Sequence, residues 1–180
     1  MQHPDSQYTK TAIGLHWLIA LLMLGTFIMG HVMSDMPFSP TKLRYVNWHK
    51  WAGVTILALA FIRLAWRLTH RPPALPAGML AWQAKAAEGA HVFLYLLMFA
   101  IPLSGYFYSM AAGYPVVYFG VLPLPVLLEK NDELKALFKI AHIVLNYTVA
   151  GVVIVHALAA LKHQFVERDG TLARMLPFLK

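Results

Sequence analysis

The residues of this chain best suited to chemistry are its nine histidines, because the sequence contains no cysteine. Without cysteine there is no disulfide, thiolate zinc site, iron–sulfur cluster or covalent Cys-x-x-Cys-His haem. A metal or cofactor would therefore be held by nitrogen, oxygen or thioether ligands. Two histidines, His3 and His70, lie in polar segments, where we expect them to be solvated. The other seven lie in or beside long apolar stretches: His16, His31, His49, His91, His142, His156 and His163.

The spacing of His142 and His156 is the strongest single signal. Fourteen residues of α-helix rise about 21 Å and leave the two side chains only about 40° apart. One helix would therefore carry imidazoles at two depths, both facing the same interior. Other apolar stretches supply histidines at these depths, and spacing alone leaves the choice open: His16 or His91 beside His156, and His49 or His31 beside His142.

Two histidine pairs at two depths fit two b-type haems, each with its iron between two neutral imidazoles in an apolar four-helix interior. A single intramembrane histidine more often makes a hydrogen bond across a bundle, but four at matched depths favour haem. Gly53, four residues after His49, and Gly105, fourteen after His91, could give a porphyrin room. Small residues equally serve close helix packing in membranes.

The composition indicates that lipid surrounds the elements that carry these histidines. Of the 180 residues, 59% are hydrophobic and only 13% are charged, yet the net charge is +7. Charged residues make up roughly 25% of ordinary soluble domains. Disordered chains combine low hydrophobicity with high charge, so that class is excluded. A single soluble core of this size could not bury so much apolar side chain.

Four stretches are long enough to cross a bilayer, which takes about 20 apolar residues. The second is the weakest, because its uncharged part covers only residues 51–62 and extends further only if Arg63 and Arg67 snorkel to the headgroups. We expect an all-α integral membrane four-helix bundle, with residues 1–180 forming one transmembrane domain. The expected spans are about 12–33, 48–68, 89–112 and 140–161.

An even number of spans places both termini on one side of the membrane. Nine Lys and Arg residues lie on that side and six on the other. The positive-inside rule therefore favours cytoplasmic N- and C-termini. The apolar start is too long for a secretory signal. Residues 113–128 are apolar but interrupted by Pro115, Pro123 and Pro125, which predicts a loop against the outer membrane surface.

Short motifs follow one another along almost the whole chain: Leu15-His16-Trp17, His49, Arg63-x-x-x-Arg67, Gly89-x-His91-x-x-x-Tyr95-Leu96, Pro115-x-x-Tyr118-Phe119-Gly120, His142, His156-Ala157-x-Ala159-Ala160 and Asp169-Gly170-Thr171-Leu172-Ala173-Arg174-Met175-Leu176-Pro177. In this order and spacing the sequence resembles the bacterial cytochrome b561 family, and within it the membrane-bound superoxide oxidases. The motifs are more specific for the family than for the superoxide reaction.

The resemblance implies a multi-pass inner-membrane bundle with two b haems. It places one haem iron between His16 and His156 near the cytoplasm, and the other between His49 and His142. It assigns no role to His31. It also implies a quinone site near the cytoplasmic haem. Residues expected there, binding quinone or haem propionates, are His91, His163, Arg63, Arg67 and Arg71.

The function that the resemblance implies is oxidation of superoxide at the periplasmic side and reduction of ubiquinone. A basic outer mouth would attract superoxide, and Lys42, Arg44 and Lys50 lie close to His49 in sequence. These cations could equally anchor lipid headgroups. The alternative is a haem-bearing relay or anchor subunit that links a periplasmic redox protein to quinone. A metal-ion transporter is disfavoured, because the expected spans contain no Asp or Glu. Membrane lipid is an expected partner and nucleic acid is not.

Overall fold

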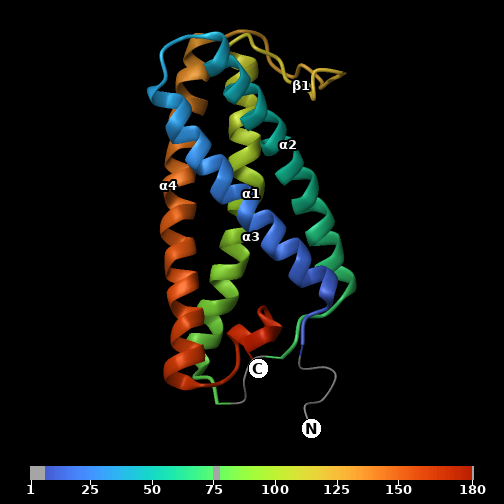
Figure 1. Cartoon of the computed structure of the whole chain (residues 1–180), viewed down its shortest axis with the longest axis vertical. Coiled ribbons are helices and arrows are strands. Elements are labelled where there is room, and N and C mark those ends of the chain that lie inside the picture. Colours follow the sequence, from blue (N-terminus) through green and yellow to red (C-terminus); the bar gives the residue numbers. More distant parts are fainter. Residues whose placement is uncertain (1–6, 75–77, 180) are drawn as a thin grey trace.

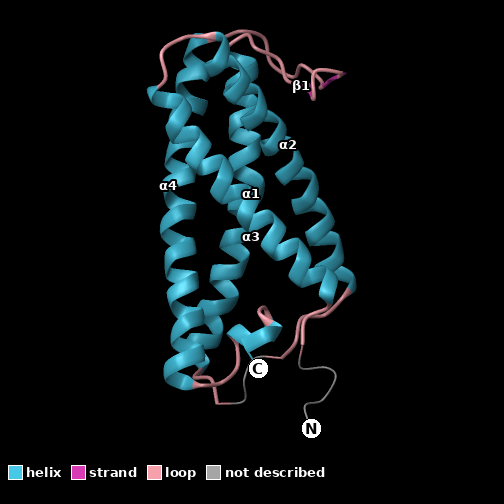
Figure 2. Cartoon of the chain, viewed as in Figure 1, coloured by secondary structure: helices cyan, strands magenta, loops and turns pink. Residues whose placement is uncertain are grey.

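Four long helices stand side by side in the computed structural model, which describes residues 7–74 and 78–179 (Figure 1). They are α1 (Lys10–Asp35), α2 (Pro40–Thr69), α3 (Ala81–Ala111) and α4 (Asp132–Lys162). All four are long and apolar enough to cross a membrane, as the sequence predicts. Helices dominate the described chain, with short loops at both ends of the bundle (Figure 2). His3 lies outside the described residues.

We call the end where α1 begins and α4 finishes the inner end, and the opposite end the outer end. Side-chain caps fix the starts of three of the four helices. Thr9, Ser39 and Asn131 are N-caps whose side chains accept hydrogen bonds from the first turns of α1, α2 and α4. Pro40 occupies the first turn of α2, where its missing N–H is harmless. These signals make α2 a 30-residue helix, although its apolar stretch is the shortest.

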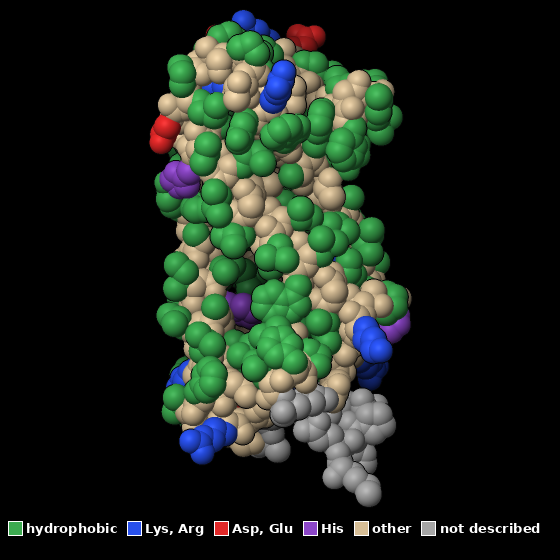
Figure 3. All heavy atoms as spheres, viewed as in Figure 1, with side chains coloured by type: hydrophobic (Ala, Val, Ile, Leu, Met, Phe, Trp, Pro, Cys, Tyr) green, Lys and Arg blue, Asp and Glu red, His purple; other side chains and the backbone are tan. Residues whose placement is uncertain are grey.

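Helix α1 packs against α2, α2 against α3, and α3 against α4. Many large apolar side chains are exposed on the outside of the bundle, where hydrophobic atoms cover much of the surface (Figure 3). This pattern suits a lipid environment, in which helix association depends on packing and hydrogen bonds rather than on hydrophobic burial.

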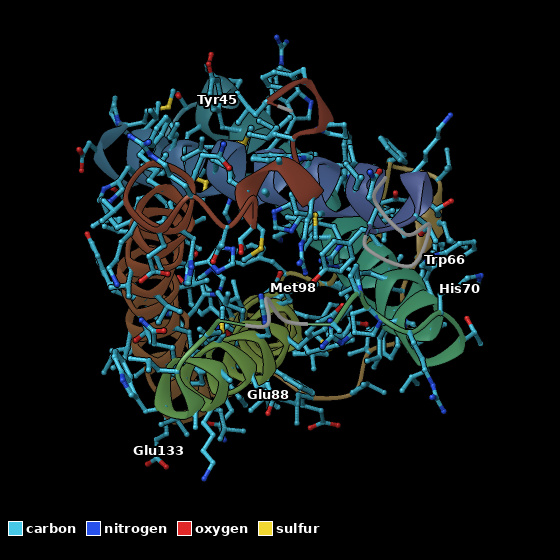
Figure 4. All side chains as sticks on the ribbon, turned by 90° about the horizontal axis from the view of Figure 1, so that it is seen from below. Tyr45, Trp66, His70, Glu88, Met98 and Glu133 are labelled. Carbon is cyan, nitrogen blue, oxygen red and sulfur yellow. The ribbon has the colours of Figure 1, made fainter. Side chains whose placement is uncertain are left out.

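The buried core is small and lies at mid-depth. One cluster contains Ile19, Ala60 and Met98, and a second contains Leu97, Ile101 and Val149. Met98 points into the interior surrounded by the four helices (Figure 4). Val149 lies seven residues from both His142 and His156, so this layer separates the two histidine depths.

The connection between α3 and α4 contains a small hairpin that the sequence analysis expected only as a loop. Strands β1 (Val117–Tyr118) and β2 (Leu122–Pro123) are antiparallel. The turn residues Phe119 and Gly120 have φ values of +50° and +75°, as a primed hairpin turn requires. With only two residues per strand and Pro123 in one of them, no alternating pattern marks these strands.

Side chains of α2 hold the hairpin in place. The indole of Trp51 donates a hydrogen bond of 2.7 Å to the carbonyl of Val117, and the hydroxyls of Thr55 and Tyr118 are 2.8 Å apart. The hairpin projects sideways at the outer end (Figure 1).

The C-terminal tail folds back beneath the bundle. Helix α4 continues as a π-helical turn, η2 (His163–Glu167), followed by the short helices η3 (Leu172–Arg174) and η4 (Pro177–Leu179). The indole of Trp17 on α1 donates to the carbonyl of Met175 at 2.9 Å. Arg174 donates to the carbonyl of Ala74 at 2.6 Å. The tail therefore lies under the inner end, between α4 and the start of α1 (Figure 1).

Candidate functional site

Three histidines from three helices gather near the inner end. The ring centroids of His16 on α1 and His156 on α4 are 6.3 Å apart, with 55° between the ring planes. His91 on α3 lies 5.6 Å from His156, with 73° between the planes. The Arg63 guanidinium donates to the carbonyl of Ala12 and lies 3.4 Å from Nδ1 of His16.

A second pair lies toward the outer end. The centroids of His49 on α2 and His142 on α4 are 6.1 Å apart, with 85° between the planes. Nδ1 of His142 lies 3.1 Å from the carbonyl oxygen of Ile101 and 3.0 Å from the Ser104 hydroxyl. A carbonyl only accepts, so this network assigns the proton to Nδ1 and leaves Nε2 with a free lone pair. Metal-bound histidines are oriented by the same kind of hydrogen bond.

The other ring of this pair, His49, lacks such a hydrogen bond. Its buried Nδ1 has no hydrogen-bond partner of normal geometry among the described residues, although the backbone of Thr26 lies nearby. A buried polar nitrogen without a partner is costly. His49 therefore lacks the well-formed orienting hydrogen bond that His142 has.

The spacing of both pairs fits an iron ion between two imidazoles. Metal–imidazole bonds are about 2.0–2.1 Å long and the ring centroid lies about 1.1 Å behind the nitrogen, so opposite ligands have centroids about 6.3 Å apart. The pairs His16–His156 and His49–His142 match this separation. The separation between His91 and His156 is too short for a straight nitrogen–metal–nitrogen arrangement. Geometry thus favours His16 over His91 as the partner of His156.

Gly105 and Gly53, the two glycines expected to give a porphyrin room, differ in what lies next to them. A Cβ on Gly105 would lie 3.0 Å from Cε1 of His142, so Gly105 makes room for the imidazole. That Gly105 also gives a porphyrin room stays a prediction. A Cβ on Gly53 would meet no atom within 4 Å, so open space does adjoin this residue. Figure 3 shows a hollow in the inner half of the bundle, with a histidine at its base.

Three arginines lie at the inner end without acidic partners. Arg63, Arg67 and Arg71 line one pocket, and no ion pair formed within residues 7–74 and 78–179 includes them. The guanidinium carbons of Arg63 and Arg67 lie 5.8 and 5.6 Å from the ring centroid of Tyr95. Such cations over an aromatic face are positioned to bind an anion or a quinone oxygen.

The same pocket contains two residues that the sequence analysis did not assign to it. Trp66 and His70 stack with ring centroids 3.9 Å apart and planes 4° apart, at the edge of α2 (Figure 4). The spacing of four residues, which puts both side chains on one helix face, was the available signal. His70 was expected only to be solvated, and it is exposed, but its ring packs on Trp66.

His163 lies beyond α4 and has two carboxylate partners. Its Nδ1 is 2.6 Å from Oε2 of Glu167 and 2.6 Å from Oδ2 of Asp169. The position of His163 at the inner end follows from the sequence, but its contact with these acids does not, because the irregular turn that brings them together has no periodic pattern.

The outer cations have backbone partners. The ammonium of Lys42 donates to the carbonyl of Met36 at 2.7 Å, and that of Lys50 donates to the carbonyl of Tyr114 at 3.2 Å. A carbonyl hydrogen bond leaves the positive charge in place. Arg44 is exposed. All three residues lie in the part of α2 before or beside His49.

His31 belongs to neither of the two histidine pairs. Its Nε2 is 3.2 Å from the Tyr147 hydroxyl, and its ring packs edge-on against Phe27 and Tyr147. His31 is exposed on the bundle surface. With Nε2 used by Tyr147, it is not equivalent to His49.

Comparison with known proteins gives a consistent result. The family model described as prokaryotic cytochrome b561 matches residues 7–178. Cytochrome b561 homolog 2 of Escherichia coli (strain K12) is 32% identical over 177 residues, covering 94% of this chain and 91% of its own length. Cytochrome b561 homolog 1 of the same organism is 32% identical over 173 residues, covering 96% and 98%. A Yersinia pestis protein named "Probable superoxide oxidase CybB" is 31% identical over 175 residues, covering 95% and 96%.

Proposed function

Because the chain belongs to the prokaryotic cytochrome b561 family, we propose that it is a di-haem cytochrome that moves electrons from superoxide to ubiquinone. Family membership itself makes the chain a multi-pass inner-membrane protein of electron transfer, with b-type haem as the family's cofactor. The number of haems, the donor and the acceptor belong to the proposal.

The proposed ligands of the inner iron are His16 and His156, and those of the outer iron are His49 and His142. The observation that carries this assignment is the separation of about 6 Å within each pair, on helices that hold the rings at two depths. The hydrogen bond from Nδ1 of His142 to Ile101 supports ligation through Nε2. Bound haem supplies reversible one-electron chemistry, while the protein supplies ligands, orientation and field.

Superoxide is the proposed donor, at the periplasmic end. Lys42, Arg44 and Lys50 form a positive region near His49, and such a region raises the encounter rate of a small anion. The name of the Yersinia pestis relative supports this choice. Two superoxide ions would each lose one electron to become dioxygen, and one ubiquinone would gain two electrons and two protons.

Ubiquinone is the proposed acceptor, at the cytoplasmic end. His91 and His163 would border its site, and Arg63, Arg67 or Arg71 would bind quinone oxygens or haem propionates. The arginines of the inner pocket, which form no ion pair within the described part of the chain, support an occupant that accepts hydrogen bonds.

A second candidate is a relay subunit that receives electrons from a periplasmic redox protein. The hairpin at the outer end favours it, because Phe119 and Val121 are 60% and 81% exposed while the hairpin itself is fastened to α2. A rigid, exposed apolar projection is a suitable docking feature.

Stopped-flow mixing of the oxidised protein with superoxide separates these candidates. Direct oxidation predicts reduction of the haem spectrum at a rate close to the diffusion limit that falls with ionic strength. An unchanged spectrum would contradict superoxide as donor and favour the relay. Equal reduction in the presence of superoxide dismutase would show that another reductant is responsible.

A further inference from the structure

The cluster of His163, Glu167 and Asp169 joins three consecutive parts of the chain at the inner end. His163 begins the π-helical turn η2, Glu167 ends it, and Asp169 lies in the loop that follows. One nitrogen, Nδ1 of His163, lies 2.6 Å from one oxygen of each carboxylate. The three side chains are 15%, 29% and 18% exposed, so the cluster is partly buried but reaches solvent.

Local backbone geometry aims the two acids at His163. Arg168 and Gly170 have φ values of +53° and +73°, which turn the chain back after η2. Oδ1 of Asp169 accepts a hydrogen bond from the N–H of Thr171 at 2.9 Å, leaving Oδ2 for the imidazole. A non-glycine residue in the left-handed region, like Arg168, is uncommon and marks a conformation that the surroundings impose.

Glu167 is held from two further elements. Its Oε1 accepts from the ammonium of Lys162 at 2.6 Å and from the side-chain amide of Gln83 on α3 at 3.3 Å. These contacts leave Oε2 for His163. Lys162, Gln83 and Thr171 therefore supply the other side-chain hydrogen bonds of the two carboxylates among the described residues.

The distances fit a shared proton better than a metal ion. Ligand atoms bound to one ion at about 2.0–2.1 Å normally stand about 3 Å or more from one another. Separations of 2.6 Å between nitrogen and oxygen are those of short charge-assisted hydrogen bonds. One N–H cannot point at both oxygens, so the proton on Nδ1 has two alternative acceptors.

We propose that His163, Glu167 and Asp169 form the proton-loading site for quinone reduction at the inner end. The two carboxylates hold the ring as imidazolium, with the Nδ1 proton between them, and Nε2 releases its proton to a quinone oxygen and takes a new proton from the cytoplasm. The site reloads once between the two proton transfers that accompany two electrons. This inference rests on the proposed function, because it requires quinone to be reduced beside His163.

The decisive experiment compares two electron acceptors. Ubiquinone needs two protons for each two-electron reduction, whereas ferricyanide needs none. Protein with chemically reduced haem is mixed with a ubiquinone analogue or with ferricyanide, and the haem spectrum is followed for wild type, Asp169→Asn and Glu167→Gln. Asp132→Asn and Glu133→Gln are matched controls at the outer end of α4.

We expect Asp169→Asn and Glu167→Gln to slow quinone reduction by about tenfold or more, at the lower end of what positioned proton donors contribute. Reduction of ferricyanide should be unchanged, and the rate difference between water and deuterium oxide should increase for quinone alone. The controls should match wild type with both acceptors.

Two outcomes would overturn the proton-loading site: quinone rates equal to wild type in both variants, or equal slowing with both acceptors. The side chain of Asp169→Asn keeps an oxygen that accepts from the N–H of Thr171. If this variant nevertheless displaces the tail, the quinone rate of Glu167→Gln decides whether the proton-loading site exists. Wild type that reduces ferricyanide but not quinone would instead contradict the proposed function.

Discussion

Gly105 on α3 faces His142 on α4 so closely that a Cβ on Gly105 would lie 3.0 Å from Cε1 of the imidazole. The missing side chain lets His142 stand between the two helices, where Nδ1 reaches the carbonyl of Ile101. One small residue thus sets the position of a proposed iron ligand on a different helix.

Gly105→Ala should therefore disturb the outer site. The new methyl group must displace the imidazole by a few tenths of an ångström, and overpacking of this kind costs about 1–3 kcal/mol. We expect lower haem content or a shifted reduction potential for one of two haem populations, measured by redox titration of the absorption spectrum. Gly89→Ala is the control on the same helix, because a Cβ there meets no atom within 4 Å. Identical titrations for wild type and both variants would contradict this role.

Each proposed ligand pair can be removed separately. His142→Ala and His156→Ala should each lose one of two haems, since iron with one remaining imidazole is weakly held, and only His142→Ala should abolish reduction from the outer face. The measurement is the pyridine haemochrome assay against protein concentration. His31→Ala should retain both haems, because His31 pairs with Tyr147 at the surface. Full haem content in both ligand variants would refute the two-site scheme.

The positive charge of the outer end should act on the rate of superoxide oxidation. Lys42→Gln combined with Arg44→Gln should slow haem reduction by about three- to tenfold at low salt, with rates converging at high salt as screening removes the attraction. Lys10→Gln combined with Lys85→Gln removes the same charge from the inner end and should leave the rate unchanged. Lys50 is kept intact because its ammonium holds Tyr114 of the distant loop between α3 and α4, whereas the partner of Lys42, Met36, is only six residues away in the chain. Equal slowing by both double variants would argue for a net-charge effect only.

Acid should release the C-terminal tail. Burial raises the pKa of Asp169, but hydrogen bonds from Thr171 and His163 outweigh it and hold this pKa below the ordinary value of 3.8. A depressed carboxyl pKa stabilises the folded tail above pH 3.8, and this contribution is lost as pH falls through the folded-state pKa. We expect a fluorescence change of Trp17, which bonds Met175 of the tail, below about pH 4.

In this acid titration the fluorescence change of Asp169→Asn should be smaller than that of wild type. Comparison with Trp17→Phe identifies the part of the fluorescence that comes from the Trp17 indole. A transition of the same size and midpoint in Asp169→Asn would assign it to other carboxyl groups.

The helices and the histidine depths could be predicted because both depend on local properties. Apolar length decides which segments span lipid, and helical periodicity puts His142 and His156 on one face whatever the neighbouring helices do. Lipid surrounds the bundle, so four long helices satisfy their backbone hydrogen bonds internally. Each predicted span therefore falls on one of the helices α1 to α4, although α2, α3 and α4 begin eight residues before the predicted starts.

Other features depend on contacts between segments distant in sequence. The hairpin of β1 and β2 is fixed by Trp51 and Thr55 of α2, so the loop's own residues do not reveal it. The sequence likewise gave no sign that Glu167 and Asp169 would meet His163, because a π-helical turn and left-handed backbone break every simple period.

By itself the sequence determined a four-span membrane protein with imidazoles at two depths, since hydrophobic length and helical rise are properties of each segment alone. Which rings face each other depends on contacts between helices. Helix rotation and tilt are set by packing between helices, and these bring His16 to the better distance from His156 while His31 turns outward to Tyr147. The same packing fixed which carboxylates meet His163 and gave Gly105 its place beside His142.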